Sequence, residues 1–166
     1  MHEKSIAILN RALADELAAV HQYMYFHFHC DDQGYDPLSN LFKQTAITEM
    51  MHAEDLAERI LFLGGEVEME LAEPVAKVHD IKGMLAKAKE MEMASVHDYN
   101  QSALECAANG DSASKQIFEK LVTGEEGHWD NFDTMEMHLE KFGEQFLALQ
   151  SIERSKSMGG GGHPGA

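Results

Sequence analysis

Apolar side chains recur at alternating steps of three and four residues through most of the chain, which is the period of an amphipathic α-helix. Ile6, Leu9 and Leu13 begin one such series. Glycine and proline interrupt the pattern at only a few places, and helices are expected between them. The pattern predicts four long helices and a short fifth one, over residues 4–33, 38–63, 80–109, 111–142 and 144–154.

The residues at these boundaries suit helix ends. Pro37 can occupy the first turn of a helix, where no amide donor is needed. Gly64 and Gly110 suit helix C-termini, and Asp80 and Asp111 are expected to cap helix N-termini. The predicted boundaries therefore have local physical causes as well as a change in pattern.

The lengths of the connections predict the topology. Short turns at 34–37 and 110–111 make two antiparallel helical hairpins. Residues 64–79 can span about 50 Å when extended, whereas the helix before them is about 40 Å long. The connection can therefore return along the whole bundle. The sequence predicts an all-α fold, a four-helix bundle with one long crossover and a short C-terminal fifth helix.

Composition indicates one acidic domain. The chain has 166 residues, 44% of them hydrophobic, which is enough for a single core. We assign residues 1–154 to this domain and expect the glycine-rich tail 155–166, which contains His163, to be disordered.

Charge and cysteine usage exclude several classes of function. Twenty-nine acidic residues against thirteen Lys and Arg give a net charge of −16, which disfavours nucleic acids and anionic membranes and favours cations. No apolar run approaches the roughly 20 residues of a membrane span, and the first residues do not resemble a signal peptide, so a cytoplasmic protein is expected. Cys30 and Cys106 are isolated, which argues against a disulfide framework or a cysteine metal site.

Each long helix carries an acidic residue in the middle of its otherwise apolar face. These residues are Glu16, Glu49, Glu92 and Glu125. Burying four carboxylates together is unfavourable unless cations or protons neutralise them. His52 and His128 follow two of these glutamates by three residues, a spacing that puts both side chains on one helix face.

An internal repeat makes this pattern specific. Adding 76 to the numbers of Glu16, Glu49 and His52 gives Glu92, Glu125 and His128, and the same shift converts Tyr23 into Tyr99. Helix rise places the three members of a hairpin within about 8 Å along the axis. Four carboxylates and two imidazoles would be neutralised by two divalent ions, and such ligands suit iron or manganese. The sequence therefore predicts a di-metal carboxylate site.

Other interpretations of single residues stay open. Any one of the six could be a polar core residue satisfied by its neighbours, or could lie on a solvated face. Tyr23 and Tyr99 lie two turns beyond Glu16 and Glu92, where they can donate a hydrogen bond or an electron to the site, or simply pack in the core. His21, His27 and His29 are expected on a solvated face or at an interface.

Three segments carry a resemblance to a known family. The runs ADELAAVHQY at 14–23, TEMMHAEDLAERILFLGG at 48–65 and GEEGH at 124–128 closely resemble bacterioferritin, and the similarity covers about residues 4–154. The resemblance implies a ferroxidase centre with Glu16, His52, Glu92 and His128 as terminal iron ligands and Glu49 and Glu125 as bridges. Fe(II) would be oxidised there by O2 or H2O2 and stored as ferric mineral.

The resemblance also implies an assembly and a second cofactor. Subunits are expected to form a hollow homo-oligomeric cage, with 24 subunits favoured and 12 possible. Met50 is expected to ligate haem at a two-fold interface, and this would be a b-type haem because the chain has no CxxCH motif. Gln44 departs from the family, because some members have an iron-binding histidine at this place.

Two other classes of protein share parts of this pattern. A non-storage di-metal enzyme, such as a rubrerythrin-like peroxidase or a manganese catalase, would use a similar ligand set. A rubrerythrin normally adds a four-cysteine iron domain, which two isolated cysteines cannot form. A non-catalytic acidic helical assembly that buffers metal is the third interpretation.

Overall fold

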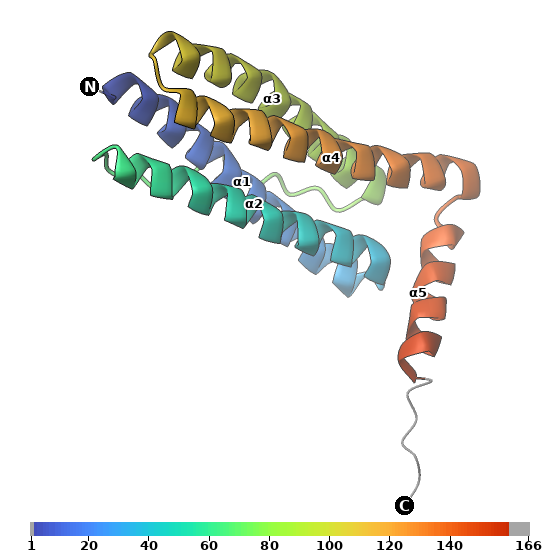
Figure 1. The fold of residues 1–166 in the computed structure, drawn as a ribbon. Coiled ribbons are helices and arrows are strands. Elements are labelled where there is room, and N and C mark those ends of the chain that lie inside the picture. The colour runs from blue at the N-terminus through green and yellow to red at the C-terminus, as the bar shows by residue number, and fades with distance from the viewer. Residues whose placement is uncertain (1, 160–166) are drawn as a thin grey trace, which may run out of the picture.

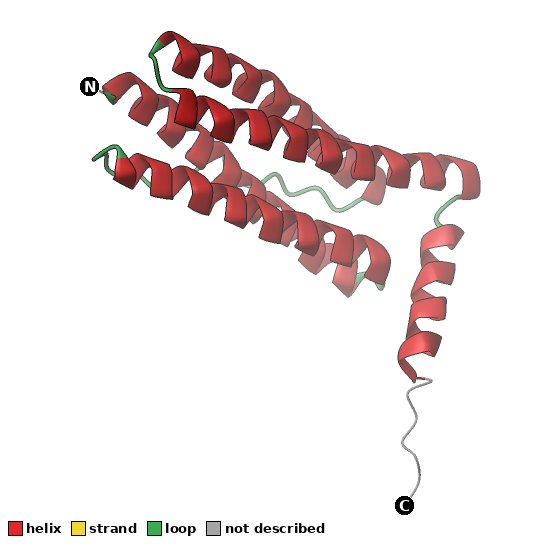
Figure 2. Ribbon diagram, in the orientation of Figure 1, coloured by secondary structure: helices red, strands yellow, loops and turns green. Residues whose placement is uncertain are grey.

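The computed structural model describes residues 2–159, and this part of the chain contains five helices and no strands (Figures 1 and 2). The helices are α1 (Glu3–Asp32), α2 (Asp36–Phe62), α3 (Ile81–Ala108), α4 (Ser112–Phe142) and α5 (Gln145–Gly159). The predicted all-α fold is confirmed, and the ends of the four long helices agree with prediction within two residues.

The predicted boundary residues act as expected. The side chain of Asp80 accepts a hydrogen bond from the backbone N–H of Gly83 at 2.8 Å, and Asp111 accepts one from Ser114 at 3.1 Å. These bonds satisfy amide donors that the first turn of a helix leaves free. After α2 and α3 the chain turns at Gly64 and Gly110 with φ of +78° and +72°, a conformation that favours glycine.

The crossover between α2 and α3 runs along the length of the bundle, so that α3 starts parallel to α2 (Figure 1). Two side-chain amides of α1 hold it in place. Asn10 donates to the carbonyl of Glu66 and accepts from the N–H of Glu68, at 2.9 and 3.1 Å. Gln22 bonds both the carbonyl and the N–H of Ala76, at 3.0 and 2.8 Å. The backbone N–H of Ala72 also donates to the carbonyl of Ala14, at 3.0 Å, so the crossover is fixed at several levels along α1.

The core consists of two hydrophobic clusters separated by a polar layer. One cluster, nearer α5, contains Phe26, Phe42 and Phe132, whereas the other contains Leu9 and Phe118. The six predicted metal ligands occupy the level between these clusters, and all six are buried. A polar layer in the middle of a helical core is costly unless its groups are paired.

The inward face of α1 differs in phase from the prediction. Continued along α1, the steps of three and four residues that begin at Ile6 would bring Val20 and His27 to the core, but Ala19 and Phe26 occupy these places. One residue along a helix turns the side chain by about 100°, and this moves His27 to the flank of the bundle, where its Nδ1 lies 2.8 Å from Ser39 Oγ. His27 is therefore a satisfied structural residue.

The fifth helix is longer than predicted. It continues to Gly159, five residues past the predicted end at 154, because residues 155–158 contain no glycine or proline to stop it. Leu147 is fully buried against the bundle, and Ser151 accepts a hydrogen bond from the N–H of Asp36 at 3.2 Å. Helix α5 thus extends into the segment 155–166 for which disorder is predicted, and residues 160–166, with His163, lie outside the described part.

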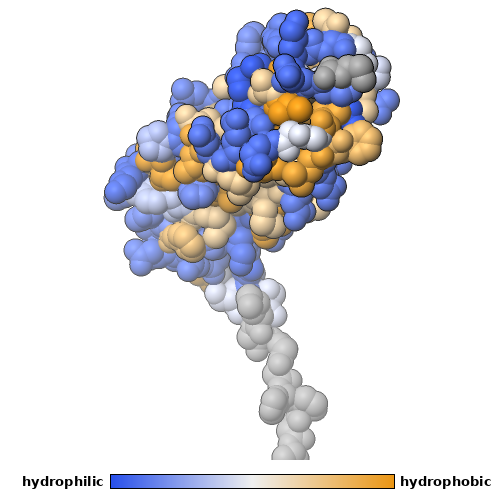
Figure 3. All heavy atoms as spheres, turned by 90° about the vertical axis from the view of Figure 1, so that its left-hand side faces the viewer, coloured by the Kyte–Doolittle hydropathy of each residue, from blue (hydrophilic) through white to orange (hydrophobic). Residues whose placement is uncertain are grey.

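The surface of the isolated chain carries hydrophobic side chains that a soluble monomer would normally bury. Figure 3 faces the end of the bundle where α1 begins and α2 ends, and hydrophobic groups lie there among hydrophilic ones. Phe62 and Leu61, at the end of α2, are 79% and 62% exposed. Within residues 2–159, no helix combines the length and the apolar character needed to cross a membrane.

Candidate metal centre

The structure brings all six predicted ligands together in the middle of the bundle. Each of the four long helices contributes, with Glu16 on α1, Glu92 on α3, and a glutamate–histidine pair on each of α2 and α4. The four glutamates are 1% exposed and the two histidines 8%. We call this set the six-residue cluster; its members are Glu16, Glu49, His52, Glu92, Glu125 and His128.

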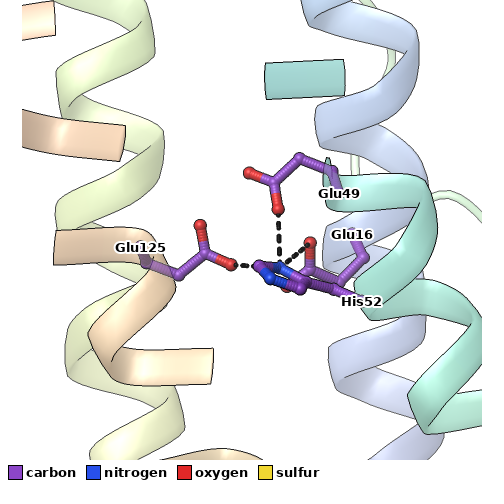
Figure 4. Close-up of side chains that lie close together, drawn as sticks. All are labelled: Glu16, Glu49, His52 and Glu125. Atoms are coloured by element: carbon purple, nitrogen blue, oxygen red, sulfur yellow. Dashed lines mark hydrogen bonds and ion pairs between the residues drawn. The ribbon is translucent and has the colours of Figure 1, made fainter. Parts of the chain in front are cut away.

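One half of the cluster is organised around His52. Its Nδ1 lies 3.0 Å from Oε2 of Glu49, 3.1 Å from Oε1 of Glu125 and 3.7 Å from Oε2 of Glu16 (Figure 4). The three carboxylates come from three different helices and converge on one ring nitrogen. An ion placed among these atoms would therefore be bound by the bundle as a whole.

The other half repeats this geometry around His128. Its Nδ1 lies 3.1 Å from Oε2 of Glu125, 3.2 Å from Oε1 of Glu49 and 3.5 Å from Oε1 of Glu92. Glu49 and Glu125 thus extend one oxygen to each histidine. In each half the candidate ligand atoms all lie within 4.8 Å of one another. The arrangement fits two neighbouring ions that share two carboxylates, and its nitrogen and oxygen donors fit iron or manganese.

Both histidines retain a proton in this environment. Burial alone would lower the pKa of His52, but hydrogen bonds to the carboxylates, that of Glu125 first, outweigh it and raise this pKa to about 12. The pKa of His128 is raised to about 12 against burial in the same way, chiefly by its hydrogen bonds to Glu125 and Glu49. Two imidazolium ions therefore stand among the four carboxyl groups.

The carboxyl groups divide into two kinds. Burial, followed by a hydrogen bond to Glu125, raises the pKa of Glu92 to about 8. Burial and the nearby charges of Glu16 and Glu92 raise the pKa of Glu49 well above its usual range. The pKa values of Glu16 and Glu125 are lowered, because hydrogen bonds outweigh the effect of burial. Without metal, the cluster is neutralised by protons at pH 7.

Two tyrosines connect the hairpins crosswise. The hydroxyl of Tyr23 on α1 donates to Oε1 of Glu92 on α3 at 2.6 Å, and the hydroxyl of Tyr99 on α3 donates to Oε1 of Glu16 on α1 at 2.8 Å. Both rings are buried, and burial with the neighbouring carboxylate charge raises both tyrosine pKa values well above the usual range. Each tyrosine therefore fixes a glutamate of the opposite hairpin.

Gly124 is a further residue of the site, which the spacing of the six ligands did not indicate. A Cβ at this position of α4 would lie 3.1 Å from Cε1 of His52, closer than most real Cβ contacts. Glycine inside a helix costs roughly 1 kcal/mol relative to alanine. A glycine one residue before Glu125 could therefore have indicated, from the sequence, that another group approaches the helix closely at this point. Its missing side chain leaves room for the imidazole.

The other candidate residues lie apart from the cluster. Met50, the predicted haem ligand, follows Glu49 but points to the outside of α2, where it is 48% exposed. Gln44 is exposed on the same helix. The ring of His29 stacks on that of His79, with centroids 4.5 Å apart. Met50 therefore takes no part in the polar layer that contains the six-residue cluster.

Comparisons with known proteins agree with this geometry. The family model of the ferritin-like domain matches residues 6–142. Bacterioferritin from Desulfovibrio desulfuricans is 34% identical over 145 residues, covering 87% of this chain and 81% of that protein. Bacterioferritin from Rhodobacter capsulatus is 36% identical over 151 residues, covering 88% and 91%.

Solved structures give the same result. The X-ray structure of the Desulfovibrio desulfuricans bacterioferritin, described as showing its diiron site in different catalytic states, has a TM-score of 0.85 at 34% identity and covers 87% of this chain and 85% of that one. The Mycobacterium tuberculosis bacterioferritin has a TM-score of 0.86 at 25% identity, covering 92% and 96%.

Proposed function

The chain belongs to the bacterioferritin family of ferritin-like proteins, and on this premise we propose that it is an iron-storage ferroxidase. Two ferrous ions are its substrates. The observation that supports the proposal is the pair of interlocking groups that share Glu49 and Glu125. Four carboxylates balance the charge of two divalent ions, so the cluster suits a pair better than a single ion.

The residues divide into two roles. Glu16 and His52 bind one ion, Glu92 and His128 bind the other, and Glu49 and Glu125 bridge them. Holding two ferrous ions side by side allows one oxidant molecule to receive two electrons. With hydrogen peroxide the balance is two Fe(II), one H2O2 and two protons giving two Fe(III) and two water molecules, so no hydroxyl radical is released. O2 is the other candidate oxidant.

Storage requires an assembly around a cavity. We propose a homo-oligomeric cage, with 24 subunits favoured and 12 possible, in which ferric product is retained as mineral. The hydrophobic side chains exposed on the isolated chain, such as Phe62 and Leu104, supply surface for subunit contacts.

One experiment separates this function from its rivals. Metal-free protein receives Fe(II) anaerobically and then O2 or H2O2, while near-ultraviolet absorbance, retained iron and particle mass are recorded. A ferroxidase that stores iron shows a rapid phase for two ions per subunit, then retains further iron in a large hollow particle. Rapid oxidation without retention, in a dimer or tetramer, would instead indicate a peroxidase or catalase, and binding without oxidation a metal buffer.

Tyr23 is proposed to position Glu92 and to supply an electron when a subunit holds fewer than two ferrous ions. Tyr23→Phe removes the 2.6 Å hydrogen bond to Glu92, and loss of such a partner lowers metal affinity by roughly 10- to 100-fold. Tyr99→Phe, which releases Glu16 instead, is the matched variant. Isothermal titration with Co(II) checks the affinity of both.

The electron donation by Tyr23 is checked by a tyrosyl radical signal after oxidation at low iron loading. This signal should be absent only in Tyr23→Phe, and identical signals in both variants would contradict the proposed electron donation.

Met50 is proposed to bind a b-type haem across a two-fold interface. Its thioether fits this role because it is half-exposed on the flank of α2, with Ile47 and Met51 also exposed on that helix. When bound, haem supplies a one-electron redox centre. Met50→Leu is expected to abolish a low-spin spectrum of one haem per two subunits while leaving assembly and iron oxidation intact. Visible spectroscopy after reconstitution measures this, and equal haem binding by the variant would disprove the assignment.

A further inference from the structure

A cavity of about 240 Å³ lies between α1, α3 and the crossover and reaches the six-residue cluster. We call it the α1–α3 cavity. Glu49, Glu92 and Tyr23, all buried, line its inner end. Asp15, Glu73 and Asp98 line it as well, and these belong to α1, the crossover and α3. The cavity therefore connects buried ligand carboxylates with acidic groups that solvent can reach.

The charges at the mouth of this cavity are not balanced. Asp98 is exposed and Asp15 half-buried, and within residues 2–159 neither makes an ion pair with a basic side chain. Glu73 differs, because Nζ of Lys87 lies 3.4 Å from its Oε1. A second cavity, of about 530 Å³, adjoins the first and also has Asp15 and Asp98 in its lining. The two unpaired carboxylates therefore stand where both cavities meet.

We propose that hydrated divalent cations reach the metal centre through the α1–α3 cavity, and that Asp15 and Asp98 attract them at its mouth. This inference rests on the proposed function, because it requires the six-residue cluster to bind metal. The alternative route passes the imidazoles of His52 and His128, which at 8% are the most exposed members of the cluster. Polar groups line the first route from the mouth to the ligands.

Lys87 is expected to lower the rate at which cations enter the cavity. Its ammonium group repels cations and at the same time occupies the carboxylate of Glu73. Removing Lys87 and removing Asp98 should therefore change the rate of metal loading in opposite directions. General damage to the fold would not produce opposite signs, so this pair of variants separates electrostatic steering from a structural effect.

The test measures how fast Co(II) enters the assembled, metal-free protein, by stopped-flow absorbance at low salt. Asp98→Asn is expected to slow loading by up to about tenfold, since one charge near a divalent ion has an effect of this order. Lys87→Gln is expected to accelerate loading. Both effects should shrink at high salt, where charges are screened. Glu140→Gln removes an exposed charge on α4, away from the cavity, and should load like the parent.

A steric variant tests the same route without a change of charge. Ser95 lines the cavity, so Ser95→Phe should slow loading at every salt concentration, whereas Ser95→Ala should load like the parent. The amount of Co(II) bound at equilibrium should stay at two per subunit in all variants. Parent-like rates in Asp98→Asn, Lys87→Gln and Ser95→Phe would overturn the route and favour entry past the histidines. Failure of the parent to bind two Co(II) ions would instead overturn the proposed function.

Discussion

Replacing Glu49 by glutamine is expected to lower the rate of rapid iron oxidation roughly 100-fold or more. Glu49 extends one oxygen toward each histidine, at 3.0 and 3.2 Å, so its loss affects both ions at once. Loss of a group that only orients a ligand already costs about 10- to 100-fold, and a shared ligand should cost at least the upper value. Glu125→Gln should behave in the same way, because Glu125 occupies the equivalent place on α4.

The control for this prediction is Glu126→Gln. Glu126 is the next residue on α4 and is exposed, so its replacement makes the same substitution of glutamine for glutamate without touching the cluster. Stopped-flow absorbance after addition of two Fe(II) per subunit measures the rate. Particle mass should stay that of the parent in all three variants. Two-iron kinetics like those of the parent in both Glu49→Gln and Glu125→Gln would remove the basis for the proposed centre.

Metal binding is expected to release protons and to stabilise the fold. At pH 7 the metal-free cluster holds protons on His52, His128, Glu49 and Glu92, whose pKa values are all raised. An ion bound by these groups must displace the protons, because ligation uses neutral imidazole and carboxylate. A metal present at 100 times its Kd adds about 2.7 kcal/mol to the free energy of unfolding.

The pH dependence of this stabilisation follows from the raised pKa values. The pKa of Glu92 is about 8 in the folded chain, above the ordinary value of 4.5, so the proton on Glu92 stabilises the metal-free fold below pH 4.5. That contribution declines above pH 4.5 and is lost as the pH rises through 8. Metal competes with this proton, so the increase in Tm with Co(II) should be larger at pH 8 than at pH 6.

Calorimetry with and without Co(II), together with a pH indicator in weak buffer, measures both effects. Glu126→Gln again serves as a control that should show the increase of the parent. A Tm that saturating metal leaves unchanged, or an increase that is smaller at pH 8 than at pH 6, would contradict the assignment of the buried cluster as the metal site.

Much of the fold could be predicted because its causes are local. Asp80, Gly110 and Asp111 act within one turn of a helix, so the sequence around them is sufficient to place the ends. The cluster could be predicted because the repeat of 76 residues relates Glu16, Glu49 and His52 to their counterparts. Chance occurrence of the six residues at these spacings is therefore much less probable than chance occurrence of any one of them.

What could not be predicted depends on contacts between helices. The choice of Ala19 over Val20 at the core is set by neighbouring helices, because both residues are apolar and lie within one turn. The role of Gly124 on α4 depends on the position of the imidazole ring of His52, which belongs to α2. The sequence placed Tyr23 and Tyr99 near the site, but nothing local indicated that each bonds the glutamate of the opposite hairpin.

The crossed tyrosine bonds also fix the axial register of the two hairpins. The smallest slip of one helix pair along the other that keeps the same helix faces in contact is one turn, about 5.4 Å. Such a slip would carry both hydroxyls out of hydrogen-bond reach of Glu92 and Glu16 and would break two buried hydrogen bonds at once. The bonds that orient the ligands thus also select one alignment of the bundle, and the ligands of both halves reach the same level before any ion arrives.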